Sequence, residues 1–198
     1  MISVYKIKPA FQKLLQPLLK ALYKGGITAN QITVAAVILS IGMGIALWYS
    51  AVYPALILVV PIGYLVRMML NALDGMMATQ YNMQSKLGEI LNELGDVISD
   101  AVIIFPLFFL PGLHPLLIIL FGVLAILNEF AGVLAKVVSG SRRYDGPMGK
   151  SDRALLIGLY CLIFYFWNDL NIAGNWIFGT ASLLTALSTI IRLHKSLK

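Results

Sequence analysis

Apolar residues fill most of this chain in long stretches that short polar segments interrupt. Each stretch approaches the length of about 20 residues that a helix needs to cross the hydrocarbon core of a bilayer, and the fifth is the shortest. The pattern predicts an all-α integral membrane protein whose six transmembrane helices form a bundle over 28–194, in a single domain spanning 1–198. The apolar stretches lie at roughly 30–50, 54–78, 86–110, 114–139, 152–168 and 173–193.

Residues 4–24 follow a different pattern. Apolar residues recur there at helical spacing, and lysines lie among them. A helix of this composition lies in the plane of a membrane surface, with its apolar side toward the lipid. We therefore expect an N-terminal interfacial amphipathic helix that precedes the bundle. Its apolar positions are Val4, Ile7, Phe11, Leu14, Leu15, Leu18 and Leu22, and its lysines are Lys6, Lys8, Lys13 and Lys20.

The composition supports a membrane location. Of the 198 residues, 59% are hydrophobic and only 12% are charged, and the mean hydropathy is +0.84. A soluble domain of this length carries about twice as much charge. These values exclude an ordinary soluble enzyme or binding domain.

The distribution of basic residues predicts the orientation. If both termini are cytoplasmic, every Lys and Arg falls on or near the cytoplasmic side, and the opposite loops around 50–54, 110–115 and 167–173 contain none. Such an asymmetry is the positive-inside signal of a multi-pass protein of the cell (inner) membrane. The net charge of +6 then reflects topology and attraction to anionic membrane lipids, so we predict no nucleic-acid partner.

Polar and acidic residues gather where the second and third apolar stretches meet. On the first helix, Asn71, Asp74, Gly75 and Ala78 share one face; on the second, Gly88, Asn92, Asp96 and Asp100 step by fours, with Glu89 and Glu93 on the same side. A short turn between the helices would aim these faces at each other. Oxygen ligands converging at the edge of the lipid indicate a site for a hard divalent cation at the cytoplasmic ends of these helices.

The same residues resemble the signature of the CDP-alcohol phosphotransferase (CDP-alcohol phosphatidyltransferase) family, D-x2-D-G-x2-A-R-x8-G-x3-D-x3-D. The spacing agrees without a gap, but Asn71 and Asn92 replace two aspartates and Thr79 replaces the arginine. The segment 27–33, ITANQIT, is similar to the T-P-N-x-I-T segment of the family. The chain resembles a small, six-helix bacterial member with a variant motif. The matching positions are Asn71, Asp74, Gly75, Ala78, Thr79, Gly88, Asn92 and Asp96.

The resemblance implies an enzyme of phospholipid biosynthesis. Such enzymes use two divalent cations, Mg²⁺ or Mn²⁺, to hold the pyrophosphate of a CDP-linked substrate, here CDP-diacylglycerol. The last aspartate, Asp96, then deprotonates an alcohol that attacks the β-phosphorus and releases CMP. The resemblance also implies a homodimer. It assigns the nucleotide to Asn30, Asp74, Gly75, Ala78, Thr79 and Gly88, and the metal to Asn71, Asp74, Asn92 and Asp96.

The two asparagines change the charge of the predicted metal site. An amide oxygen binds a divalent cation more weakly than a carboxylate does. Glu93, three residues before Asp96, is best placed to restore a charge, so we add it to the predicted metal ligands. Alternatively, the site holds a single metal in the absence of substrate.

The most basic loop precedes the fifth apolar stretch and favours an acceptor alcohol that itself bears a phosphate. The family has a similar loop there, where basic residues meet the polar acceptor. Lys136 is added because it shares a helix face with Glu129 and is expected to face inward. The alternative is that these residues are ordinary positive-inside charges. The predicted acceptor-binding residues are Lys136, Arg142, Arg143, Lys150 and Arg153.

Two other functions stay open. The carboxylates together with Lys136 could form a cation or proton pathway in a small transporter. Against this, the acids cluster at one side, and no polar route continues through the last two apolar stretches. The three motif differences also permit a catalytically inactive membrane scaffold.

Overall fold

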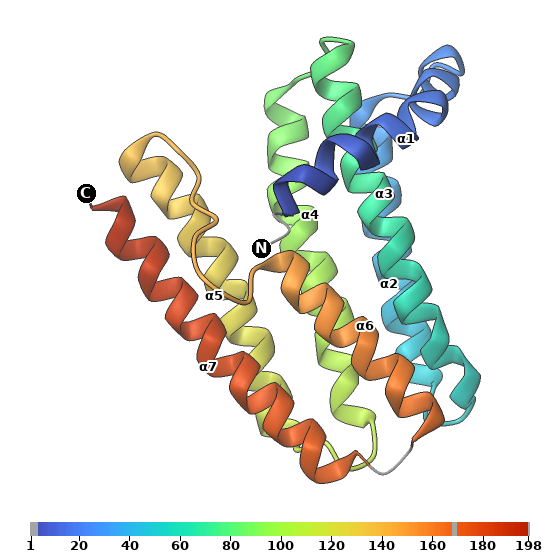
Figure 1. Ribbon diagram of the computed structural model, residues 1–198, viewed down its shortest axis with the longest axis vertical. Coiled ribbons are helices and arrows are strands. Elements are labelled where there is room, and N and C mark those ends of the chain that lie inside the picture. Colours follow the sequence, from blue (N-terminus) through green and yellow to red (C-terminus); the bar gives the residue numbers. More distant parts are fainter. Residues whose placement is uncertain (1–3, 168–169, 198) are drawn as a thin grey trace.

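The computed structural model describes residues 4–167 and 170–197, and over these ranges the chain is helical, without a strand (Figure 1). Six long helices follow the six predicted apolar stretches. Two of the stretches contain a short 3-10 helix, each with a proline in its first turn. The elements are α1 (Val4–Lys24), α2 (Ala29–Tyr49), η1 (Pro54–Leu58), α3 (Val59–Gln80), α4 (Lys86–Ile104), η2 (Phe105–Phe109), α5 (Pro115–Ser139), α6 (Lys150–Phe166) and α7 (Asn171–Ser196).

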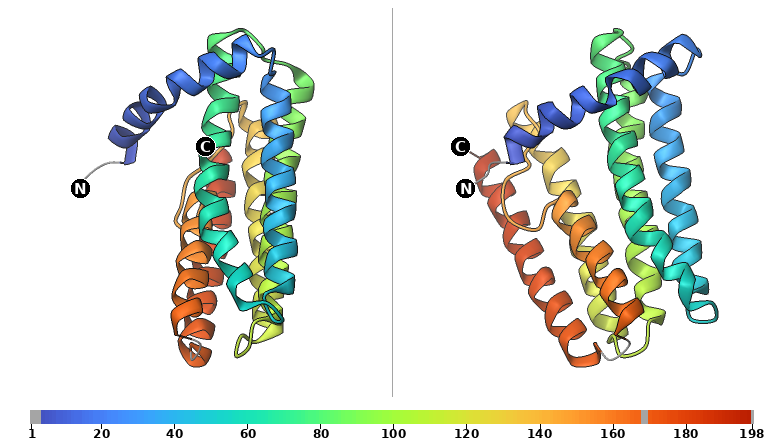
Figure 2. Two further views of the ribbon diagram at one scale, coloured as in Figure 1. Left: turned by 90° about the vertical axis from the view of Figure 1, so that its right-hand side faces the viewer. Right: turned by 45° about the vertical axis from the view of Figure 1, so that its right-hand side comes forward.

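Helices α2 to α7 lie side by side and run up and down, so that their connections fall at two opposite ends (Figures 1 and 2). The turns at 25–28 and 81–85 and the end of α7 lie at one end, and the turns at 50–53 and 110–114 lie at the other. Helix α1 crosses the first end obliquely and extends beyond the bundle (Figure 2). The acidic and basic segments of the sequence therefore meet at one end of the bundle.

Close contact of α2 with α4 fixes the geometry of that end. A Cβ atom at Gly44 would lie 2.2 Å from the carbonyl oxygen of Val102, so only glycine permits this separation of the helices. On the α3 side, a Cβ atom at Gly63 would lie 2.6 Å from the side chain of Met43. Small residues at helix crossings allow backbones to approach in this way in membranes.

Helix α1 is attached to the bundle. Leu15 and Leu19 are buried in an apolar cluster that includes Leu73 and Met77 of α3. The ring of Tyr23 stacks on that of Tyr81 just after α3, with centroids 3.7 Å apart. Another side of α1 exposes Leu14 and Leu18. Contact of this exposed apolar side with the membrane surface remains a prediction.

Four segments in the described part of the chain are long and apolar enough to cross a bilayer, and the chain is a multi-pass membrane protein. These are Ala29–Tyr49, Pro54–Gln80, Pro115–Ser139 and Ile172–Ser196. The other two predicted spans, α4 and α6, differ for identifiable reasons: α4 carries five charged residues, Lys86, Glu89, Glu93, Asp96 and Asp100, and α6 has only 17 residues. The arrangement with six spans therefore remains a prediction.

Candidate functional site

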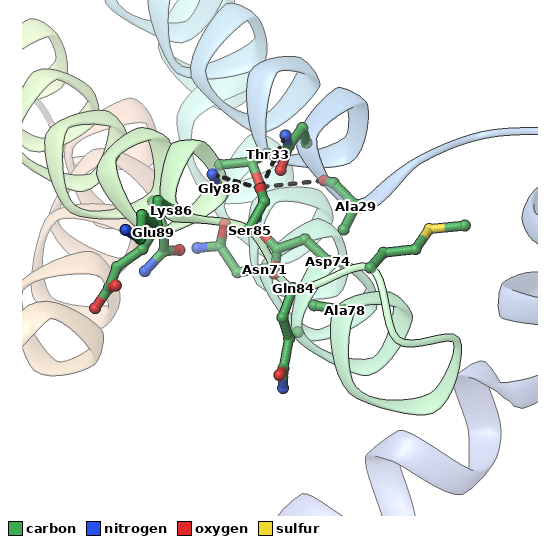
Figure 3. A pocket seen from close by; sticks show the side chains of 14 residues that line it. Ala29, Thr33, Asn71, Asp74, Ala78, Gln84, Ser85, Lys86, Gly88 and Glu89 are labelled. Atoms are coloured by element: carbon green, nitrogen blue, oxygen red, sulfur yellow. Dashed lines mark hydrogen bonds between the residues drawn. The ribbon is translucent and has the colours of Figure 1, made fainter.

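A cavity of about 650 Å³ lies between the start of α2, the last turns of α3 and the start of α4 (Figure 3). Side chains from all three helices surround it, and two of these helices, α3 and α4, carry the motif. The predicted site residues that line it are Asn30, Asn71, Asp74, Gly75, Ala78, Gly88 and Asn92.

Asp74 is the carboxylate that α3 contributes to this cavity. It is 8% exposed, and the hydroxyl of Thr33 donates a hydrogen bond to its Oδ2 at 2.9 Å. Thr33 also lines the cavity, although the sequence analysis missed it. The signal was present: Thr33 follows Asn30 by three residues, so helical periodicity puts both on one side of α2. The bond fixes one carboxylate oxygen of Asp74.

The start of α4 is held against α2 by a polar contact. Ser85 caps α4 by accepting a hydrogen bond from the amide of Gly88 at 2.9 Å, and Asn30 Nδ2 donates to Ser85 Oγ at 3.5 Å. A Cβ atom at Gly88 would lie 2.6 Å from Oδ1 of Asn30. A side chain at this position would therefore displace the end of the Asn30 side chain.

The other motif glycine has a different role. A Cβ atom at Gly75 would meet no atom of the described residues within 4 Å, because this position faces the open cavity. Thr79, one turn later, lies outside the cavity lining. Its exposed hydroxyl donates to the carbonyl oxygen of Gly75 at 2.8 Å, so it is bonded to its own helix.

Asp96 follows Asn92 by one helical turn and is paired with cations from two other helices. Lys150 Nζ, at the start of α6, donates to Asp96 Oδ1, and Nη2 of Arg67 on α3 lies 3.7 Å from the same oxygen. No hydrogen bond or ion pair within the described residues involves Oδ2 of Asp96. The predicted catalytic base thus has one fixed and one available oxygen.

The predicted acceptor-binding residues do not form one free basic cluster. Lys136 is paired with Glu89 at the surface, and Lys150 with Asp96. Arg143 donates to the backbone oxygen of Lys195 at 3.4 Å. The two remaining residues, Arg142 and Arg153, each contact two carboxylates: Arg142 contacts Glu93 at 2.5 Å and Glu129 at 2.7 Å, and Arg153 contacts Asp100 at 2.7 Å and Glu129 at 2.8 Å.

The loop that carries Arg142 and Arg143 is fastened to α7. The ammonium of Lys195 donates to Asp145 Oδ1 at 2.5 Å and thereby lowers the pKa of that carboxyl. Ser188 and Arg192 donate to the backbone oxygen of Asp145, at 3.0 and 3.2 Å. Gly146, with φ of +96°, lets the backbone turn against α7, where a Cβ atom would lie 2.4 Å from Ser188 Oγ.

The residues around the cavity fit one divalent cation better than two. Asp74 supplies a carboxylate, and Asn71 and Asn92 supply amide oxygens, which are ligand types that Mg²⁺ and Mn²⁺ accept. Asp96 and Glu93 are instead paired with Lys150 and Arg142. Among the described residues, no group of three or more His, Cys, Asp and Glu side chains could hold a metal ion.

Comparisons with known proteins identify a family, a relative and similar folds. A family model described as CDP-alcohol phosphatidyltransferase matches residues 26–190. Inner membrane protein YnbA of Escherichia coli (strain K12) is 46% identical over 199 residues, which cover 99% of this chain and 97% of that protein. The crystal structure of Mycobacterium tuberculosis phosphatidylinositol phosphate synthase with CDP-DAG bound has a TM-score of 0.79 at 16% identity, covering 94% of each chain. The same synthase in complex with manganese and citrate has a TM-score of 0.75 at 18% identity, covering 90% of this chain and 88% of that one.

Proposed function

The chain belongs to the CDP-alcohol phosphatidyltransferase family, and we propose that it transfers a phosphatidyl group from CDP-diacylglycerol to a small polar alcohol and releases CMP. The observation that carries this proposal is the cavity between α2, α3 and α4, which six motif residues line together with Asn30. The cavity lies at the end of the bundle where the basic segments meet, and its walls combine small residues, which leave room, with polar oxygens.

In the proposed reaction, the alcohol oxygen forms a bond to the β-phosphorus while the bond from this phosphorus to the CMP oxygen breaks. The proton of the alcohol passes to Oδ2 of Asp96, the oxygen that no described residue occupies. Lys150 and Arg67 hold the other oxygen and orient the carboxylate. The proton thus goes to a fixed acceptor beside the cavity.

We further propose that the reaction needs a divalent cation, Mg²⁺ or Mn²⁺, held by Asp74 with amide oxygens of Asn71 and Asn92. When bound, such an ion would neutralise the pyrophosphate and the leaving group. The hydrogen bond from Thr33 to Oδ2 keeps the Asp74 carboxylate oriented for binding this cation. Glu93, a predicted ligand, instead anchors Arg142 in this proposal.

For the membrane, we propose six spans in the cell (inner) membrane, with α1 on the surface and both termini and the site cytoplasmic. The internal ion pairs of α4 support this, because charges that pair inside the bundle need not face lipid. The similarity to the inner membrane protein YnbA of Escherichia coli supports the inner membrane. A homodimer remains a prediction from the family resemblance.

The test uses purified full-length protein in lipid nanodiscs, with CDP-diacylglycerol, Mg²⁺ or Mn²⁺ and a panel of alcohols, and measures CMP release. We expect alcohol-dependent CMP release that EDTA abolishes. Asp74→Asn and Asp96→Asn should each lower the rate by about a hundredfold or more, because they remove a metal ligand and the base. Folded protein that releases no CMP with any alcohol would overturn the proposal in favour of an inactive scaffold, and cation flux without CMP release would favour a transporter.

A further inference from the structure

Three arginines converge on one buried carboxylate, that of Glu129 on α5. Arg142 Nη2 lies 2.7 Å from Glu129 Oε2, while Arg153 Nη2 and Arg192 Nη1 lie 2.8 and 3.7 Å from Oε1. Glu129, Arg153 and Arg192 are at most 3% exposed. We call Arg142, Arg153 and Arg192 the arginine cradle. Its members come from the 140–149 loop, α6 and α7, so the fold assembles it from separate parts of the chain.

Neighbouring parts of the structure leave room for the cradle. A Cβ atom at Gly132, one turn after Glu129, would lie 3.4 Å from Arg192 Nη1 and 3.5 Å from Arg142 Nε. The same atom would lie only 2.9 Å from the backbone oxygen of Arg143. Glycine at this position therefore lets the backbone of the loop come close to α5, with both guanidinium groups at ordinary contact distance.

Guanidinium groups bind phosphate and carboxylate oxygens with the same fork-shaped set of donors. A cradle of three would suit a phosphate, but here Glu129 supplies the anion. Arg142 and Arg153 also contact Glu93 and Asp100, so three arginines face three carboxylates. A phosphate entering this cluster would add negative charge beside three carboxylates that already pair with the arginines.

The cradle is joined to the proposed base. Arg153 contacts both Glu129 and Asp100, and Arg67 contacts both Asp100 and Asp96. An acceptor alcohol placed with its hydroxyl at Asp96 would therefore have the cradle as its neighbour. The anion that occupies the arginine cradle therefore determines whether an acceptor with a phosphate group can bind.

We propose that Glu129 determines the class of the acceptor: its carboxylate fills the arginine cradle and excludes a phosphate, so the acceptor is an alcohol without a phosphate group. This inference rests on the proposed function. The sequence alone favoured a phosphate-bearing acceptor, because the basic loop was visible but its pairing with Glu93, Asp100 and Glu129 was not. Glu129 is therefore a specificity-determining residue, because its carboxylate pairs with the arginines in the way that a phosphate would.

The first test measures binding without catalysis. Wild-type protein, Glu129→Ala and Glu129→Gln are purified in detergent, and their thermal unfolding is compared in sodium phosphate and sodium chloride of equal ionic strength. Phosphate should raise the unfolding temperature of Glu129→Ala, and to a smaller extent of Glu129→Gln, more than that of wild type, because it replaces the lost anion, whereas wild type should show only the non-specific stabilisation that phosphate gives. Asp145→Ala is the matched control, since it removes a carboxylate of the same loop outside the cradle.

The second test compares glycerol with sn-glycerol 3-phosphate as acceptors in the CMP release assay. Wild type should prefer glycerol, and Glu129→Gln or Glu129→Ala should shift the ratio of kcat/KM toward the phosphate ester by about tenfold or more. Transfer by wild type to the phosphate ester as readily as to glycerol would overturn the inference. So would folded Glu129 variants, Glu129→Gln included, that respond to phosphate no more than wild type does.

The two proposals fail in different ways. If no alcohol supports CMP release in any variant, the proposed function fails, and the unfolding measurements still decide whether Glu129 blocks a phosphate site. If CMP is released but phosphate affects neither binding nor acceptor choice in the Glu129 variants, only the role of Glu129 fails.

Discussion

The ammonium of Lys150, in the first turn of α6, donates a hydrogen bond to Oδ1 of Asp96 on α4. The two residues are 54 positions apart in the sequence. Because Arg67 approaches the same oxygen, the carboxylate is held on one side only. This relationship makes Lys150 a positioning residue for the proposed base, in addition to a topology-determining charge.

Lys150→Ala should therefore lower kcat by about tenfold, the effect expected from losing one hydrogen bond between charged groups, with a smaller change in KM. Lys150→Arg should recover part of the loss, because an arginine can reach the same carboxylate. Lys195→Ala is the control, since it also removes a lysine paired with an aspartate but lies outside the site. Equal losses in Lys150→Ala and Lys150→Arg, or a pure KM effect, would contradict positioning of Asp96.

Substitutions at the two motif glycines, Gly75 and Gly88, should affect different properties, substrate binding in the first case and stability in the second. Gly75→Leu should leave thermal stability near wild type and raise KM for CDP-diacylglycerol, because its Cβ meets no other described residue within 4 Å and the side chain enters the open cavity. Gly88→Ala should destabilise the protein by about 1 kcal/mol or less, because its Cβ would displace the end of the Asn30 side chain and weaken its contact with Ser85.

Gly42→Leu serves as the control for Gly75→Leu, since a Cβ atom there also meets nothing in the described residues within 4 Å and the position lies outside the cavity. Enzyme assays with varied CDP-diacylglycerol and thermal unfolding give the two readouts. A KM that is the same for Gly75→Leu and Gly42→Leu would show that the nucleotide binds elsewhere.

Thr33→Val tests the contact that orients Asp74. Valine keeps the shape of threonine but cannot donate to Asp74 Oδ2, so one hydrogen bond to a charged group is lost. We expect the Mn²⁺ affinity, measured by titration of the purified protein, to fall by about tenfold. Thr33→Ser should retain most of the affinity. If Thr33→Val binds Mn²⁺ as tightly as wild type does, the hydrogen bond from Thr33 does not contribute to metal binding by Asp74.

Much of the architecture was predictable, because its causes are local. The helices follow the apolar stretches, and the motif spacing places Asn71, Asp74 and Asn92 around one cavity, since helical periodicity depends only on nearby residues. The ion pairs were not predictable in the same way. Arg153 reaches Glu129 across 24 residues, and long side chains choose among several partners only when the packing of α5, α6 and α7 is fixed. The ion pairs of Asp96 and Asp100 also explain why α4 does not qualify as a membrane span by hydropathy alone, because hydropathy counts paired charges as if they were unpaired.

The orientation can be checked with single cysteines in a background lacking the buried Cys161. Pro111 and Ser141 are exposed and flank the two opposite ends of α5, so they suit cysteine substitution. In intact cells, an impermeant maleimide should label Pro111→Cys only, and Ser141→Cys should react after lysis. This result is expected because Arg142 and Arg143 adjoin Ser141, whereas no Lys or Arg lies near Pro111. The reverse labelling would put the site outside the cell and contradict the proposed topology.

The final prediction concerns the number of cations. Asp74 is the only carboxylate of the predicted metal set that no cation contacts directly in the described structure, because Asp96 and Glu93 are paired with Lys150 and Arg142. Wild type should therefore bind one Mn²⁺ per chain, as counted by electron paramagnetic resonance of the free ion during titration, and Asp74→Asn should bind none.

Restoring the missing charges should strengthen that binding. Asn71→Asp together with Asn92→Asp puts two more carboxylates at the cavity wall, which should tighten Mn²⁺ binding by about tenfold or more. Asn82→Asp is the matched control, because it adds a carboxylate in the exposed turn before α4, outside the cavity lining. Two Mn²⁺ ions bound with similar affinity by wild type would mean that Asp96 exchanges Lys150 for a metal, and the one-cation site would have to be abandoned.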